Sequence, residues 1–238
     1  MIRGILFDKD GTLFDFNATW RGVAETALAR LAPNDPQKAR EMALAAGYDP
    51  DRRSFVAGSA LVAGAASEVA AIWAPFLPGR TRAELERQIN ALAAEAEGPE
   101  LTPAAADLPG LLAGLGREAG RALGVATHDS EDAARAHLGA VGALDAFSFI
   151  AGYDSGWGLK PGPGMVHAFC DASGIEPSQV AMIGDSLHDL GAGRAARAGL
   201  VVGVLTGPAD EAELSELADI VVPSIEALPG LLAERAAG

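Results

Sequence analysis

The chain has 238 residues, of which 49% are hydrophobic and 5% aromatic, and its formal net charge at pH 7 is -14. This length accommodates one sizeable domain, or a domain with a smaller insert, and the charge argues against broad contact with nucleic acid or anionic lipid. A single cysteine, Cys170, excludes an internal disulfide framework and a cysteine-based zinc site. No signal peptide precedes the first predicted strand and no stretch approaches membrane-spanning length, so we expect a cytoplasmic protein.

Two carboxylates flank a lysine in residues 8–12, Asp-Lys-Asp-Gly-Thr, which follow the apolar run 5–7. In an extended strand successive side chains point to opposite sides, so Asp8 and Asp10 should share one side and Lys9 the other. Carboxylates crowded at the end of a strand repel unless a cation or a proton lies between them. The Gly-Thr pair turns the chain and places both acids at the carboxyl end, where open α/β sheets bind ligands. Taken alone, the pattern also fits an acidic surface loop.

Residues 17–98 contain no convincing strand. Helices are predicted over 18–31, from Pro36 to near 47, and over 81–97, where Thr81 and Glu84 have the spacing of a capping box. We therefore expect an all-helical insert over 17–99, inside a domain formed by residues 1–16 and 100–238. The connections at 14–16 and 98–103 could act as hinges.

From about residue 100, short apolar runs alternate with helical patterns. Strands are predicted at 122–126, 147–150, 180–183, 200–204 and 220–222, with helical patterns at 108–120, 131–138, 163–173 and 209–217. This alternation predicts an α/β fold with a Rossmann-like parallel sheet that is covered on both faces, to which residues 2–7 also belong.

Polar residues follow several of these predicted strands. The Thr127 hydroxyl, between a strand and a helix, suits a phosphoryl oxygen, and an ordinary strand-to-helix turn is the alternative. Lys160 lies in a loop rich in Gly and Pro that would hold its charge in place, and a solvated loop lysine is the alternative. Asp185 and Asp189 are spaced to face one direction, as carboxylate ligands of Mg²⁺ would. Helix capping explains Asp185 but not Asp189. His137, His167 and Cys170 fit plain helix residues.

In chain order, the sequence carries D-x-D-G-T at 8–12, a strand-terminal Thr127, the loop residue Lys160 and G-D-S-x-x-D at 184–189. Together these motifs resemble the haloacid dehalogenase superfamily, and within it the phosphoglycolate phosphatase-like branch. The resemblance covers the sheet and implies that the helical insert is a mobile cap. It implies a Mg²⁺-dependent phosphatase that acts on small phosphate monoesters, with 2-phosphoglycolate as the expected substrate.

The resemblance also implies a role for each matching residue. Asp8 would be the nucleophile that forms an aspartyl-phosphate, and Asp10 would protonate the leaving alkoxide and then activate water. Magnesium would be held by Asp8, the backbone carbonyl of Asp10, and Asp185, with Asp189 in support. The transferring phosphoryl group would be bound by Thr127 and Lys160.

Three features depart from the family pattern. Lys9 stands at a position that is usually apolar, and alternation predicts that it forms an ion pair behind the strand. His128 stands where relatives commonly carry Asn, although its backbone N–H could still bind phosphate. The insert offers several candidate specificity residues, namely Trp20, Arg21, Arg52, Arg53 and Trp73.

Two alternatives remain open at this point. A β-phosphoglucomutase-like phosphosugar mutase shares the aspartyl-phosphate but returns the phosphoryl group to a sugar. A non-catalytic binding module could keep the fold, although the intact set of motif residues argues against it.

Overall fold

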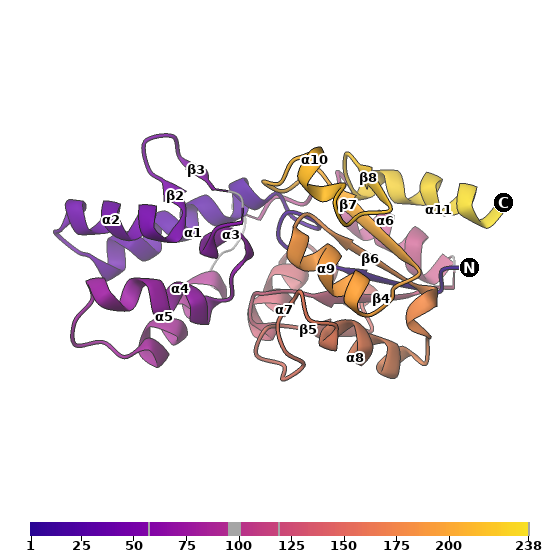
Figure 1. Ribbon diagram of the computed structural model, residues 1–238, viewed down its shortest axis with the longest axis horizontal. Helices are drawn as coiled ribbons and strands as arrows, with labels where there is room; N and C mark the ends of the chain where they lie inside the picture. The colour runs from indigo at the N-terminus through magenta and orange to yellow at the C-terminus, as the bar shows by residue number, and fades with distance from the viewer. Residues whose placement is uncertain (57, 95–100, 119, 238) are drawn as a thin grey trace.

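The computed structural model describes residues 1–56, 58–94, 101–118 and 120–237. Its main feature is a six-stranded sheet with the strand order β5-β4-β1-β6-β7-β8, in which all neighbours pair in parallel (Figure 1). In that order the strands run over Phe149–Ala151, Ala122–Ala126, Gly4–Phe7, Val180–Gly184, Leu200–Val204 and Ile220–Val222. The predicted fold class, a Rossmann-like parallel sheet, is confirmed.

Helices cover both faces of this sheet, because its strands are apolar on both sides. Ile5 and Phe7 of β1 belong to the core on one face and Leu6 to the core on the other. The first face packs against α6 (Leu108–Ala113), α7 (Glu131–Ala140) and α11 (Leu228–Ala237). The second packs against α8 (Gly164–Ser173) and α9 (Leu187–Ala195), while α10 (Glu211–Leu214) lies beside α9 and β7. Between α6 and β4, residues Gly114–Glu118 form one π-helical stretch.

Two glycines make room for the largest side chain on the second face. Phe169 of α8 is fully buried against β1 and β4. A Cβ atom at Gly4 would lie 2.9 Å from the Phe169 ring, and one at Gly124 would lie 2.7 Å from it. The absence of these two side chains therefore lets the helix pack closely on the sheet.

A second group of helices, here called the helical segment, lies between β1 and β4 in the chain and at one end of the molecule (Figure 1). Its elements are α1 (Phe16–Leu31), α2 (Pro36–Ala46), α3 (Ala60–Ala63), α4 (Ala66–Trp73) and α5 (Arg82–Ala94). They enclose a core of their own around Trp73, whose indole N–H donates to the Met42 carbonyl at 2.9 Å. The expected boundary and hinge near residues 98–100 lie outside the described residues. The division into two domains therefore stays a prediction.

The expectation of an all-helical insert is wrong at one place. Strands β2 (Tyr48–Asp49) and β3 (Ser54–Phe55) pair as a short antiparallel hairpin. Gly47, at φ +92°, ends α2, and the Asp49 carboxylate accepts hydrogen bonds from the backbone N–H groups of Asp51 and Arg52. Two-residue strands are too short to leave an alternating pattern in the sequence.

No helix in the described ranges combines the length and the apolar character that crossing a membrane requires.

Replacing Phe169 by Ala should lower the free energy of unfolding by about 3–5 kcal/mol, because a fully buried ring leaves a cavity between α8 and the sheet. Leu44→Ala on α2, where the side chain is 51% exposed, should change it by less than about 0.5 kcal/mol. Urea unfolding followed by circular dichroism measures both. Equal effects of the two substitutions would contradict this account of the core.

Candidate active site

Three predicted motif residues lie side by side at the carboxyl edge of the sheet. Phe7, the last residue of β1, is in register with Val125 of β4 and Ile183 of β6. Asp8, Thr127 and Asp185 follow these strands and therefore emerge at the same edge. The Asp8 N–H still donates to the Ile183 carbonyl at 2.8 Å, which holds the start of the loop against β6.

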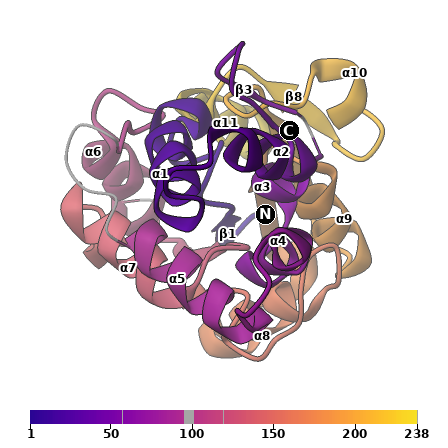
Figure 2. The same ribbon diagram turned by 90° about the vertical axis from the view of Figure 1, so that its left-hand side faces the viewer.

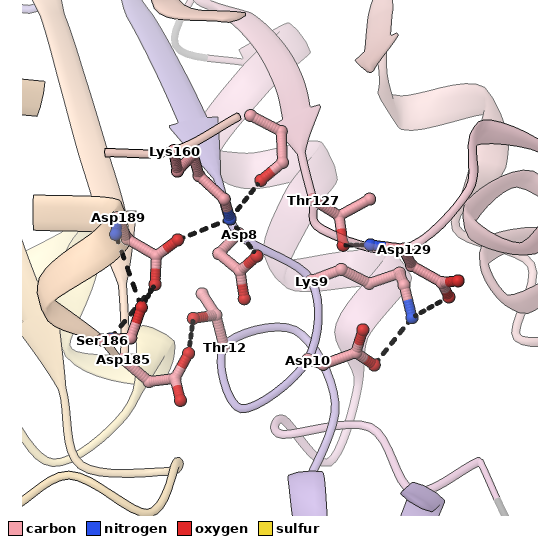
Figure 3. A network of polar contacts seen from close by, with 11 residues as sticks. Asp8, Lys9, Asp10, Thr12, Thr127, Asp129, Lys160, Asp185, Ser186 and Asp189 are labelled. Carbon is pink, nitrogen blue, oxygen red and sulfur yellow. Dashed lines mark hydrogen bonds and ion pairs between the residues drawn. The ribbon is translucent and has the colours of Figure 1, made fainter. Parts of the chain in front are cut away.

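Lys160 reaches this edge from the loop that follows β5 and is buried there (Figure 3). Its ammonium donates to Asp8 Oδ1 at 2.6 Å, to Asp189 Oδ1 at 2.5 Å and to the Ala126 carbonyl at 2.9 Å. An ammonium has three N–H donors, so these partners account for all of them. The prediction that the loop holds Lys160 in place is consistent with this geometry.

Burial dominates the electrostatics of the carboxylates. It raises the pKa of Asp8 to about 7 despite the opposing charge of Lys160, and it raises the pKa of Asp185 well above its usual range. Burial alone would also raise the pKa of Asp189, but the charge and hydrogen bond of Lys160 outweigh it and hold that pKa below its usual range. Lys160 therefore compensates Asp189 fully and Asp8 only in part, and it makes no hydrogen bond to Asp185.

The Asp185 carboxylate is enclosed by two glycines. A Cβ atom at Gly11 would lie 2.3 Å from Asp185 Oδ2, and one at Gly207 would lie even closer to the same oxygen. Gly11 also has φ +87°, a conformation that side chains disfavour. Thr12 Oγ1 donates to Asp185 Oδ1 at 3.3 Å, and Thr206 Oγ1 donates to the Gly11 carbonyl at 2.5 Å. The glycine turn predicted at residue 11 thus brings the first motif against the fourth.

This arrangement fits an oxygen-ligated metal ion. Asp8, Asp185 and Asp189 each offer a carboxylate oxygen, and these oxygens lie within 4.8 Å of one another. Asp189 already has other partners, because Oδ1 accepts from Lys160 and Oδ2 accepts from the N–H and hydroxyl of Ser186. Asp8 and Asp185 are left as the carboxylates best placed to face a cation, and hard divalent cations such as Mg²⁺ take oxygen ligands of this kind.

Lys9 forms ion pairs, as the sequence predicts, and one of its partners is the neighbouring Asp10. Lys9 Nζ is 2.7 Å from Asp10 Oδ1 and 3.3 Å from Asp129 Oδ2, in a group set apart from Lys160 (Figure 3). As alternation predicts, Asp8 and Asp10 line the pocket at this sheet edge and Lys9 does not. The pairing of Lys9 with the adjacent Asp10 was not predicted, and it forms where β1 has ended at Phe7 and the chain turns. Burial lowers the pKa of Lys9, but the charges of Asp10 and Asp129 more than reverse this and leave it raised.

A pocket lies between the sheet edge and the helical segment. In the end-on view the helices of this segment lie in front of the sheet (Figure 2). Motif residues line its sheet side, namely Asp8, Asp10, Thr127, His128, Lys160, Asp185 and Asp189. The side formed by the helical segment is mostly apolar and includes Phe16, Trp20, Leu61, Val69, Ile89 and the polar Asn90. Among the candidate specificity residues, Trp20 lines the pocket, whereas Trp73 is buried in the core of the helical segment. Arg52 and Arg53 pair with Asp49 and Glu25.

Sequence reasoning missed several residues of this region. Asp129 is buried, donates its N–H to Thr127 Oγ1 at 3.0 Å and pairs with Lys9. His137, expected to be a plain helix residue, is fully buried and lies 3.0 Å from Lys9 through Nδ1. The sequence signal that could have indicated Asp129 was its position two residues after Thr127. For His137 the sequence offered none, since its partner is 128 residues away.

Comparisons with known proteins agree with the motifs. The family model for haloacid dehalogenase-like hydrolases matches residues 2–197. The chain belongs to this family. As a hydrolase of that family it is similar to a phosphoglycolate phosphatase of Rhodospirillum rubrum, with 32% identity over 85% of this chain and 79% of the relative. A phosphoglycolate phosphatase of Chromobacterium violaceum is 38% identical over 52% of this chain and 55% of its own length.

Solved structures share the fold of this hydrolase. The crystal structure of a predicted phosphoglycolate phosphatase from Haemophilus somnus superimposes with a TM-score of 0.72 at 19% identity, covering 97% of this chain and 98% of that one. The likeness extends over the helical segment as well as the sheet, because nearly the whole of both chains is covered.

Gly11→Ala should destabilise the protein more than Gly142→Ala. Both positions have positive φ, so each substitution strains the backbone, but only at Gly11 would the new methyl group collide with Asp185. We expect the Gly11 variant to lose about 1–3 kcal/mol more in free energy of unfolding than the Gly142 variant. Denaturant unfolding of the two proteins side by side measures the difference. Equal losses would show that Gly11 does not approach Asp185 closely.

Proposed function

We propose that this protein is a Mg²⁺-dependent phosphatase that hydrolyses small phosphate monoesters through an aspartyl-phosphate on Asp8. The observation that carries the proposal is the meeting of Asp8, Lys160 and Asp185, from three distant motifs, at one edge of the sheet. The family membership and the names of its relatives support the same chemistry.

The reaction divides one displacement into two easier ones. An Asp8 oxygen attacks phosphorus, the ester P–O bond breaks, and Asp10 gives its proton to the departing alkoxide. A water molecule then attacks the phosphorus of the aspartyl-phosphate while Asp10 accepts its proton, and the P–O bond to Asp8 breaks. Inorganic phosphate leaves and the Asp8 carboxylate is restored.

Electrostatics must supply most of the rate. Enzymatic hydrolysis of phosphate monoesters can exceed the uncatalysed rate by ~10²¹, whereas general acid–base catalysis contributes roughly 10²–10⁴. Mg²⁺, when bound by Asp8, Asp185 and the Asp10 carbonyl, supplies charge that offsets the repulsion between phosphate and carboxylate. Lys160 contributes a fixed positive charge beside Asp8, and Thr127 with the His128 N–H would orient the phosphoryl oxygens.

The apolar residues of the helical segment that line the pocket would contact the alcohol part of the substrate. The helical segment closes over the sheet edge and would exclude water while Asp8 is phosphorylated. We propose 2-phosphoglycolate as the first substrate to test, because two relatives carry the name phosphoglycolate phosphatase. We also propose a cytoplasmic location, where such metabolites occur.

Asp8→Asn should reduce phosphate release at least about 10³-fold, because the amide cannot form the acyl phosphate. The fold should persist, since the change removes a buried charge. Phosphate release from a panel of small esters, including 2-phosphoglycolate, measures the loss, and Asp171→Asn on the exposed side of α8 is the matched control. An Asp8 variant with substantial activity would refute the nucleophile. Product analysis separates the alternatives, since transfer to sugar without free phosphate would favour a mutase.

Stabilisation of the protein by Mg²⁺ should grow between pH 5 and pH 7 and level off above that range. Without a cation the folded protein holds the proton on Asp8 up to a pKa of about 7, whereas the unfolded chain releases it near 3.8. The stability that Asp8 contributes therefore falls as pH rises through this window. Mg²⁺ binds the deprotonated form and offsets that fall, by about 3 kcal/mol at a hundredfold excess over Kd. Thermal unfolding with Mg²⁺ or chelator measures the effect. A shift that stays constant with pH, or persists in Asp185→Asn, would contradict the proposed site.

A further inference from the structure

Lys9 is a fully buried cation that the mechanism above does not use. Its side chain has no exposed surface, and removing an ammonium group from water costs several kcal/mol unless charged partners compensate. Asp10 at 2.7 Å and Asp129 at 3.3 Å supply that compensation. The Asp10 carboxylate, which lines the pocket, is therefore held by a cation that does not itself line it.

His137 extends this network to the helical segment. Its Nδ1 lies 3.0 Å from Lys9 Nζ, and because an ammonium can only donate, Nδ1 must be the acceptor. The ring proton then lies on Nε2, which donates to the carbonyl of Ala93 on α5 at 2.7 Å. The contacts with Lys9 and Ala93 thus require the neutral form of His137 that carries its proton on Nε2. One imidazole ring joins the lysine beside Asp10 to a helix on the other side of the pocket.

Two aromatic rings complete the surroundings of Lys9. Its Nζ lies 5.4 Å from the centre of the Trp20 ring on α1 and 5.7 Å from the centre of the Phe14 ring. Both distances fall within the range of cation–π attraction. Trp20 and Ala93 belong to the helical segment, whereas Asp10, Asp129 and His137 do not. The environment of Lys9 is therefore complete only when the helical segment lies on the sheet edge.

We propose that Lys9 is a positioning residue for Asp10, and that His137 makes this positioning depend on the docked helical segment. The inference rests on the proposed function, in which Asp10 protonates the leaving group. Asp10 would take up its working orientation when α1 and α5 enclose Lys9, so that proton transfer and closure of the pocket occur together.

The test compares two leaving groups in Lys9→Met, a variant of similar length without the charge. The nitrophenolate of p-nitrophenyl phosphate leaves with little protonation, whereas the alkoxide of an alkyl ester such as propyl phosphate requires a proton. We expect kcat/KM for the alkyl ester to fall at least tenfold more than kcat/KM for the aryl ester. For each ester, kcat/KM depends only on the steps up to departure of the leaving group. Slower hydrolysis of the aspartyl-phosphate therefore does not affect the comparison of the two esters. Lys38→Met, at a partly exposed lysine on α2, is the control.

A second pair of variants separates positioning from stability. His137→Leu removes both hydrogen bonds and should show the same selective loss, about threefold or more, whereas His137→Gln can keep an acceptor and a donor and should restore most of it. Should Lys9→Met fail to fold, this pair decides the matter. Equal losses for the two esters, or none, would overturn the positioning role while leaving the phosphatase intact. Failure of the unmodified protein to hydrolyse either ester would overturn the proposed function itself.

Discussion

The structure depends on compensating a concentration of negative charge that the fold itself creates. Parallel strands deliver Asp8 and Asp185 to one sheet edge, and α9 adds Asp189. All three are buried, and water cannot screen their repulsion there. One ammonium group, that of Lys160, bonds to two of them, which leaves Asp185 and part of the charge on Asp8 uncompensated. A site that keeps such an imbalance in the folded protein is suited to binding a cation and stabilising a phosphoryl group.

The two aspartates of the first motif are separated by their partners. Asp8 faces Lys160, and Asp10 faces Lys9, so each carboxylate has its own buried lysine although only one residue lies between them. The turn that begins after Phe7 makes this possible by directing neighbouring side chains into different surroundings. The proposed mechanism gives these two carboxylates different roles, and their separate partners place them in different surroundings.

The sequence predicted the features that depend on local pattern. Apolar runs located the strands, with β4 found at its predicted residues, and the Thr81–Glu84 capping box forms as expected. It predicted that Thr127 and Asp185 lie near Asp8, because each follows a strand that is in register with β1. It failed where contacts join distant residues or where regular geometry ends. Alternation did not reveal the contact between Lys9 and Asp10, because the strand has already ended at Phe7. The contact between Lys9 and His137 joins residues that no local pattern relates.

The helical segment keeps an apolar core of its own, distinct from the cores on the two faces of the sheet. Because the helical segment packs around its own core, exchanging it for another segment would leave the cores on the two faces of the sheet buried. Grafting related segments onto this sheet would change the wall that surrounds the alcohol while leaving the phosphorus chemistry in place. Such chimeras would have to retain an indole and a carbonyl group where Trp20 and Ala93 now stand. Substrate selectivity could then change while the catalytic residues stay the same, provided that each new segment still encloses Lys9.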